Sequence, residues 1–217
     1  MKVFHLPDEI KALAFDMDLT LYTNQEYAQY QLDCVIKKLG IKKGLPFEKM
    51  KAEIETASEA LRQSNGGKQV SFSKVLNSYG ISTEEIAHWR NELLEPENFI
   101  QKDAALNETL DELSGHFTLG LVTNSPVLVA LKTIAALGVA RHFPVIVGLD
   151  TCMVSKPHEK PYLKFVELAS VPAEFCVSIG DRFEVDLDIP LKLGMGGILV
   201  SGVEDVYKLP SILVKGG

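Results

Sequence analysis

Five short apolar runs constrain the fold of this chain more than any other feature of its sequence. Each has the length of a single strand, and they occupy residues 11–15, 117–122, 144–147, 175–179 and 197–200. Runs that are apolar on both faces are typical of central parallel strands covered by helices on both sides of a sheet. We therefore predict a parallel sheet whose strands come from distant parts of the chain.

Helical patterns separate most of these runs, and they cover residues 104–113, 126–137, 161–169 and 184–193. In the second pattern, Ser125 is placed to cap the amino terminus, Pro126 suits the first helical position, and Gly138 marks the end. Strands that alternate with helices predict an α/β fold built on a doubly wound parallel sheet.

The segment from residue 22 to residue 99 breaks this alternation, because it contains no convincing strand pattern. Four helical stretches are predicted there instead, at residues 24–39, 46–64, 71–79 and 83–94, with glycines in the intervening breaks. We predict an all-helical domain at residues 22–99, inserted into a core domain that comprises residues 1–21 and 100–217.

Composition and charge limit the partners that the chain can have. Its 217 residues include 29 acidic and 22 basic side chains, for a net charge of −7, which argues against a surface for nucleic acid. No apolar run reaches the roughly 18 residues of a membrane helix, and the amino terminus lacks a signal-peptide pattern. With Cys34, Cys152 and Cys176 expected to be free thiols, these features predict a cytoplasmic protein without a membrane partner. The oligomeric state is not predictable from the sequence.

Small polar or acidic side chains follow three of the predicted strands. They are the pairs Asp16 and Asp18, Thr123 and Asn124, and Asp181 and Asp186. In an open α/β sheet, ligands bind beyond the carboxyl ends of the strands. We therefore expect these three pairs to meet at one edge of the sheet, although they are far apart in the chain.

Asp16 and Asp18 can divide the roles that phosphoryl transfer requires. Asp16 would attack phosphorus, whereas Asp18 would protonate the leaving oxygen and then activate the hydrolytic water. Two acidic residues in a loop are more often a solvated turn. Carboxylates at the end of a buried strand, however, are costly unless they are paired or bind a metal, so the position of this pair favours catalysis.

Asp181 and Asp186 are candidates for a metal site, because hard divalent cations prefer carboxylate ligands. We expect Asp181 to be a direct ligand. Asp186 is expected to hold a water of the ion or to orient Asp181, and the alternative is that it complements the dipole of the helix that begins nearby. The neighbouring Asp188 is interpreted as structural.

Thr123, Asn124 and Lys156 are candidates for binding the oxygens of a phosphoryl group. The hydroxyl of Thr123 and the amide or backbone N–H of Asn124 can donate hydrogen bonds, and the helix that follows presents its positive end. The alternative is that these residues only cap that helix. Lys156 would add a point charge, and Lys160 is the competing candidate for this role.

Taken together, these segments resemble the four motifs of the haloacid dehalogenase-like hydrolase superfamily. The resemblance is carried by FDMDLTL at residues 15–21, LVTN at residues 121–124, SKP at residues 155–157, and IGD at residues 179–181 followed by Asp186. It extends along the whole chain with the motifs in order, and four motifs at suitable spacing are far more specific than any one of them.

The resemblance implies a Rossmann-like core, a Mg²⁺ cofactor and an aspartyl-phosphate intermediate on Asp16. It implies that Asp16, the backbone carbonyl of Asp18, and Asp181 hold the ion, and it favours Lys156 over its competitor as the family's lysine. The helical insert is similar to the cap of subfamily I, which would close over the site and read the leaving group. Arg182 departs from the family pattern, in which Ser, Thr or Asn is commoner.

We accordingly predict a phosphoric monoester hydrolase that acts on a small phosphorylated metabolite. A nucleotide, a sugar phosphate and a phosphoglycolate-like acid all remain open as substrates. A phosphotransferase such as a sugar-phosphate mutase would use the same motifs, and a non-catalytic binding module on the same fold is a further alternative. The presence of Asp18, Asp181 and Asp186 argues against the dehalogenase branch of the family, which needs neither the acid–base carboxylate nor the metal.

Overall fold

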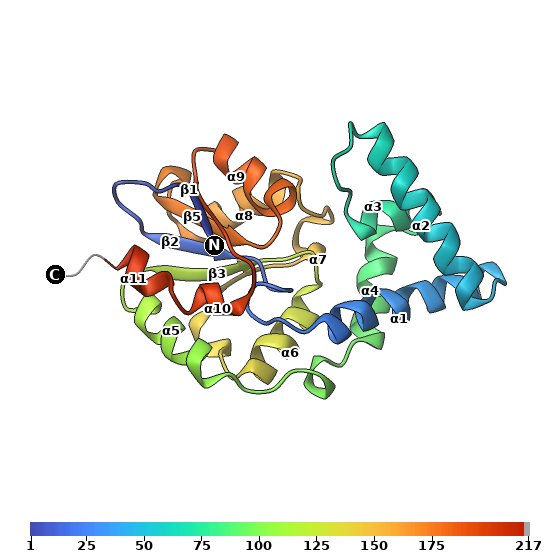
Figure 1. Ribbon diagram of the computed structural model, residues 1–217, viewed down its shortest axis with the longest axis horizontal. Helices are drawn as coiled ribbons and strands as arrows, with labels where there is room; N and C mark the ends of the chain where they lie inside the picture. Colours follow the sequence, from blue (N-terminus) through green and yellow to red (C-terminus); the bar gives the residue numbers. More distant parts are fainter. Residues whose placement is uncertain (215–217) are drawn as a thin grey trace.

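A six-stranded sheet in the order β1-β6-β5-β2-β3-β4 forms the centre of the computed structural model, which describes residues 1–214 (Figure 1). Strands β2 to β6 are parallel to their neighbours, whereas β1 lies antiparallel to β6 at one edge. The strands are β1 (Lys2–His5), β2 (Ala12–Phe15), β3 (Thr118–Val122), β4 (Val145–Val147), β5 (Cys176–Gly180) and β6 (Gly196–Leu199).

The five predicted strands are confirmed as β2 to β6, and the α/β class with a doubly wound parallel sheet is confirmed with them. Strand β1 was not predicted. All four of its residues are exposed, and its pairing is interrupted by a bulge, so it lacks the continuous apolar run by which a buried strand is recognised.

Helices cover both faces of the sheet (Figure 1). The buried side chains of α5 (Ala104–Ser114), α6 (Val127–Leu137), α10 (Val203–Val206) and α11 (Leu209–Leu213) join one hydrophobic cluster. On the other face, α8 (Lys160–Ala169) and α9 (Asp188–Lys192) pack in a second cluster. Beyond the carboxyl edge of the sheet lies the short helix α7 (Leu149–Cys152).

Two local expectations for the core were wrong. Residues 184–193 do not form one helix, because a π-helical turn at Phe183–Leu187 (η4) precedes α9. Ser125 does not cap α6. Pro126 occupies the N-cap position with an extended backbone, and the hydroxyl of Ser125 contacts Asp18 instead.

The segment at residues 22–99, which follows β2, folds as four α-helices, in agreement with its predicted patterns. They are α1 (Gln25–Lys43), α2 (Phe47–Ser64), α3 (Phe72–Ser78) and α4 (Thr83–Leu93), and the chain returns to the sheet through a short 3-10 helix, η1 (Pro96–Asn98). Side chains of Asn24, Ser71 and Ser82 accept hydrogen bonds from the first turns of α1, α3 and α4, as N-cap residues commonly do. We refer to these four helices as the helical insert.

The helical insert has a hydrophobic cluster of its own, to which Leu149 of α7 also contributes. It lies beside the carboxyl edge of the sheet (Figure 1), where the hydroxyl of Ser71 lies 2.7 Å from that of Ser155. On its outer side, Lys38 and Lys42 of α1 form ion pairs with Glu92 and Glu85 of α4. The lysines of α1 therefore form a solvated face.

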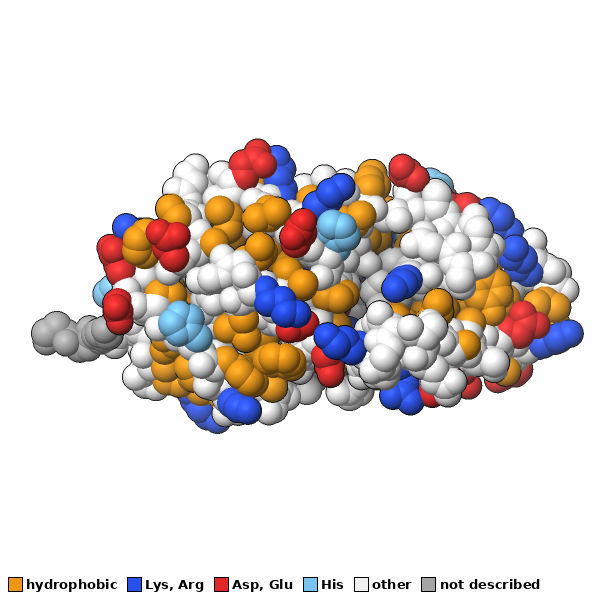
Figure 2. All heavy atoms as spheres, turned by 90° about the horizontal axis from the view of Figure 1, so that it is seen from above, with side chains coloured by type: hydrophobic (Ala, Val, Ile, Leu, Met, Phe, Trp, Pro, Cys, Tyr) orange, Lys and Arg blue, Asp and Glu red, His pale blue; other side chains and the backbone are white. Residues whose placement is uncertain are grey.

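Charges of both signs are interspersed on the face of the molecule drawn in Figure 2. Within residues 1–214, no helix combines the length and the apolar character that a membrane span requires.

Candidate active site

The pairing of the three central strands sets the position of the site. Phe15 of β2 lies opposite Leu121 of β3 and opposite Ile179 of β5, so the three strands end level with one another. The residues that follow therefore leave the sheet side by side, which brings together chemical groups from three distant parts of the chain.

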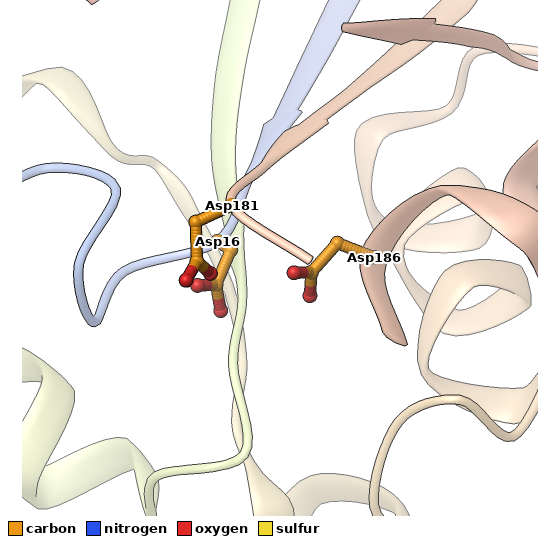
Figure 3. A group of neighbouring side chains, drawn as sticks. All are labelled: Asp16, Asp181 and Asp186. Atoms are coloured by element: carbon orange, nitrogen blue, oxygen red, sulfur yellow. The ribbon is translucent and has the colours of Figure 1, made fainter. Parts of the chain in front are cut away.

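Three carboxylates gather at this edge. One oxygen from each of Asp16, Asp181 and Asp186 can be chosen so that all three lie within 4.8 Å of one another. Figure 3 shows Asp16 and Asp181 projecting from the ends of neighbouring strands, while Asp186 approaches from the turn that precedes α9. Asp16 and Asp186 are buried, and the Asp181 side chain is 15% exposed. Such a group of hard oxygen atoms is suited to a divalent cation.

Gly180 makes the close approach of Asp186 possible. A Cβ atom at position 180 would lie 2.4 Å from the Cβ of Asp186 and 2.9 Å from its Oδ2, so any side chain there would displace the carboxylate. The backbone N–H of Arg182 donates to the same Oδ2 at 3.1 Å. A glycine is therefore needed at position 180 of the fourth motif, because only a residue without a side chain leaves room for Asp186.

Lys156 joins two of the carboxylates. Its Nζ lies 2.6 Å from Oδ1 of Asp16 and 2.6 Å from Oδ1 of Asp186, and its side chain is 1% exposed. Burial alone would lower the pKa of Lys156, but the charges of Asp16 and Asp186 together raise it above its ordinary value. The lysine therefore carries a full charge at the centre of the cluster, whereas the competing Lys160 is exposed.

Asp181 is the carboxylate that lacks such a partner. Its Oδ1 is buried and accepts no hydrogen bond from residues 1–214, since the nearest cation, Nε of Arg182, lies 3.5 Å away without hydrogen-bond geometry. Burial, followed by the charge of Asp16, raises the pKa of Asp181 to about 6. A bound cation would give Oδ1 of Asp181 a partner and would lower the pKa of this carboxyl group.

Asp18 points away from this cluster and toward the helical insert. Its carboxylate accepts hydrogen bonds from the hydroxyl of Tyr22, from Nε2 of Gln31 at 2.8 Å, and from the hydroxyl of Ser125 at 3.1 Å. These donors belong to the linker after β2, to α1 and to the loop after β3. The two acidic residues of the first motif therefore occupy different surroundings, as a nucleophile and an acid–base group require.

Thr123 and Asn124 lie at the same edge, but their side chains are already engaged. Oγ1 of Thr123 accepts from the backbone N–H of Ser125 at 3.1 Å. The amide of Asn124 makes two hydrogen bonds with the backbone of Lys156, at 2.7 and 3.2 Å. The Asn124 side chain thus fixes the loop that carries the lysine, which sequence analysis did not anticipate.

A pocket of about 200 Å³ lies between the helical insert and the core. The core contributes Asp18, Asn124, Asp181 and Arg182 to its lining, and the insert contributes Gln31, Ser71, Ser73 and Arg90. The exposed Arg182, which departs from the family pattern, therefore lines this pocket beside Asp181.

Gln31, Arg90 and Ser125 are site residues that sequence analysis missed. Gln31 and Arg90 lie in helices rich in charged residues, where polar side chains usually face solvent. One signal was present, because Arg90 follows the buried Ile86 by four positions and so shares its helix face. Nothing in the local sequence indicated that these side chains turn toward Asp18 or its pocket.

A sequence profile of the family described as Haloacid dehalogenase-like hydrolase matches residues 13–200. The chain belongs to this family of hydrolases. The matched residues contain the four sequence motifs that resemble those of the family, together with the helical insert. The family assignment drawn from the motifs is therefore confirmed.

Among curated relatives, a protein named phosphoglycolate phosphatase from Shigella boydii is 26% identical over 190 residues, which cover 80% of this chain and 75% of that protein. A phosphoglycolate phosphatase of Colwellia psychrerythraea is 35% identical over 65 residues, or 30% of this chain and 29% of that protein. The second match is thus confined to less than a third of either protein.

Solved structures of the family share the fold. A phosphatase of this family from Thermococcus onnurineus superposes with a TM-score of 0.63 at 22% identity, covering 94% of this chain and 98% of that one. A hydrolase of the family from Bacillus subtilis, determined bound to magnesium, gives a TM-score of 0.59 at 18% identity, covering 94% and 100%. At these identities the similarity concerns the fold alone.

Proposed function

We propose that this protein is a magnesium-dependent phosphatase that hydrolyses a small phosphomonoester through an aspartyl-phosphate on Asp16. The observation that carries the proposal is the division of carboxylates at the edge of the sheet. Asp16 is fixed by Lys156 among Asp181 and Asp186, whereas Asp18 faces the pocket under the helical insert. A nucleophile and a separate acid–base group are what this reaction requires.

The carboxylates fit a divalent cation on two observations. The buried Oδ1 of Asp181 has no hydrogen-bond donor in the described part of the chain, and the pKa of this group is raised to about 6 by burial and by Asp16. Asp16 and Asp181 would hold Mg²⁺ together with the backbone carbonyl of Asp18. The ion would neutralise charge on the phosphoryl oxygens. The magnesium-bound relative from Bacillus subtilis supports this choice of ion.

The reaction assigns one step to each carboxylate of the first motif. A carboxylate oxygen of Asp16 forms a bond to phosphorus while the bond from phosphorus to the leaving oxygen breaks, and Asp18 donates its proton to that oxygen. Asp18 then accepts a proton from a water molecule that attacks the acyl phosphate, which releases inorganic phosphate and restores Asp16.

The remaining residues position the reacting groups. Lys156 holds Asp16 and balances its charge, and with Thr123 and the backbone N–H of Asn124 it would bind phosphoryl oxygens. Asp186 holds Lys156 from the opposite side and so orients it. The two phosphoglycolate phosphatase relatives support a small phosphorylated metabolite as substrate.

Phosphate release tests the proposal. Purified protein is incubated with p-nitrophenyl phosphate and with a panel of phosphorylated metabolites, in the presence of Mg²⁺ or of EDTA. We expect magnesium-dependent release that is lost in Asp16→Asn and retained in Asp188→Asn, whose side chain pairs with Lys192 outside the cluster. Release that survives in Asp16→Asn, or no release from any compound, would contradict the proposal.

A further inference from the structure

The proposed chemistry leaves two charged groups of the pocket without a role, the exposed Arg182 beside Asp181 and the buried Arg90. Arg90 lies on α4 of the helical insert, and its side chain contacts the core, where Nη1 donates to the backbone carbonyl of Asn124 at 3.0 Å. In the described chain of residues 1–214, this is the only hydrogen bond of its guanidinium.

The guanidinium is buried without an ion pair. Arg90 is 7% exposed, its Nε has no hydrogen-bond partner, and it forms no ion pair with a carboxylate of residues 1–214. Burial lowers the pKa of Arg90, and the charge of Asp18 in the same pocket only partly offsets this. A buried charge without an ion pair is destabilising, so buried arginines are normally paired. An arginine has five N–H donors, and this one therefore retains donors that an anion could accept.

The position of Arg90 relates it to the leaving group of the substrate. It lines the same pocket as Asp18, the proposed proton donor to the leaving oxygen. Lys156, which does not line this pocket, is the cation in contact with the nucleophile Asp16. The phosphoryl group and the rest of the substrate thus each have a cation of their own.

We infer that Arg90 binds a second anionic group of the substrate, carried by the leaving group, and that it selects phosphomonoesters with such a group. A carboxylate or a second phosphate would supply this chemistry, because the planar guanidinium donates two parallel hydrogen bonds to either one. The inference rests on the proposed function, to which it adds the substrate class and a specificity-determining residue.

The pocket has room for a small leaving group. Its volume of about 200 Å³ corresponds to roughly seven water molecules at about 30 Å³ each. A leaving group of a few carbon atoms with one anionic end fits in this space.

Three substrates of nearly equal size test the inference in the wild-type enzyme. Phosphoglycolate has an anionic leaving group, the monophosphate of ethylene glycol has a neutral one, and phosphoethanolamine has a cationic one. We expect kcat/KM to decrease in that order, with about 10- to 100-fold between the anionic and the neutral substrate, as a charged hydrogen bond implies. A short-chain bisphosphate distinguishes a second phosphate from a carboxylate as the preferred group.

Variants assign the preference to Arg90. We expect Arg90→Met to reduce the ratio of kcat/KM for phosphoglycolate to that for the neutral substrate to about one, and Arg90→Lys to keep part of it. Arg62→Met, which removes an exposed arginine of the same insert, should preserve the ratio. An equal loss for all three substrates in Arg90→Met would mean that the residue only holds the insert to the core, or binds the transferred phosphoryl group, and would overturn the inference.

A binding measurement gives a second readout that does not depend on turnover. 3-Phosphonopropionate has the carboxylate of phosphoglycolate with a methylene in place of the bridging oxygen, and 3-hydroxypropylphosphonate is its neutral counterpart. By calorimetry with Mg²⁺ we expect the wild type to bind the carboxylate analogue about 10- to 100-fold more tightly than the neutral one, and Arg90→Met to bind both alike.

If the wild type releases phosphate from all three substrates at similar rates, the inference fails while the proposed function stands. If no compound releases phosphate, the proposed function fails and the binding preference still decides the role of Arg90.

Discussion

Replacement of Asp181 by asparagine should stabilise the protein when magnesium is absent. The carboxyl group is largely buried, Oδ1 accepts no hydrogen bond in the described structure, and its pKa is raised to about 6 from an ordinary value of 3.8. A carboxyl group with a higher pKa in the folded state binds a proton on folding. Its contribution to folding therefore becomes unfavourable as the pH rises from about 4 to 6, and the penalty is complete above that range.

The size of the effect follows from the shift in pKa. About two units at about 1.4 kcal/mol each give a penalty of about 3 kcal/mol above pH 6. Asparagine has nearly the same shape and no charge, so we expect Asp181→Asn to raise the free energy of unfolding by about 2–3 kcal/mol at pH 8. Near pH 4, where the carboxyl group is protonated, we expect wild type and variant to differ little.

Urea denaturation in EDTA at pH 4 and pH 8 measures this difference, with m-values compared to ensure that the same transition is followed. Excess Mg²⁺ should offset most of this difference at pH 8, because an ion at 100 times its Kd stabilises the wild type by about 2.7 kcal/mol and the variant by less. Asp188→Asn, whose carboxylate has a lowered pKa through its hydrogen bond with Lys192, should show no gain. A variant that is less stable than the wild type in EDTA at pH 8, or equally shifted at both pH values, would refute the reasoning.

Three further substitutions probe the site. Lys156→Met should lower the free energy of unfolding in EDTA by about 3–5 kcal/mol, because it leaves buried carboxylates without their cation. As a control, Lys160→Met replaces an exposed lysine and should change the free energy of unfolding by less than about 0.5 kcal/mol. Gly180→Ala should cost about 1–3 kcal/mol, because the added methyl overlaps a neighbouring carboxylate, and calorimetric titration should show weaker Mg²⁺ binding. Gln31→Met removes a donor to Asp18 and should reduce kcat about 10-fold for alkyl phosphates, but less for p-nitrophenyl phosphate, whose leaving group needs little protonation.

Each of these outcomes has a clear opposite. A stable lysine variant in EDTA would mean that the carboxylates are protonated and need no cation. Unchanged magnesium affinity in the glycine variant would show that the displaced carboxylate takes no part in holding the ion. An equal loss of kcat for both kinds of substrate in the glutamine variant would indicate a general disturbance of the pocket.

Much of the core could be predicted because its signals are local. Strands β2 to β6 are short apolar runs, and burial on both faces makes such runs distinctive. The convergence of Asp16 with Asp181 follows from strand direction alone, since carboxyl ends of parallel strands share one edge. The helices of the insert could be predicted because capping residues and glycines mark where they begin and end, as Asn24 and Gly44 do for α1 and Ser82 does for α4.

The remaining features depend on tertiary contacts that leave no local trace. Strand β1 is exposed and gains its hydrogen bonds only from β6. Ser125 looks like an N-cap residue in sequence, but a hydrogen bond with Asp18, more than 100 positions earlier, takes its hydroxyl. The side chain of Asn124 is likewise committed to the backbone of Lys156, which no spacing rule could reveal.

The central position of β2 also determines when this site can form. Ala12 pairs with Thr118 on one side and with Cys176 on the other, so both neighbours of this strand come from more than 100 residues later in the chain. Contacts of such long range form slowly, whereas the helices between them are stabilised locally. A growing chain can therefore build its insert early, but it cannot assemble the carboxylates before β5 has been synthesised. Enzymatic activity during refolding would report the completion of the sheet rather than the appearance of helical structure.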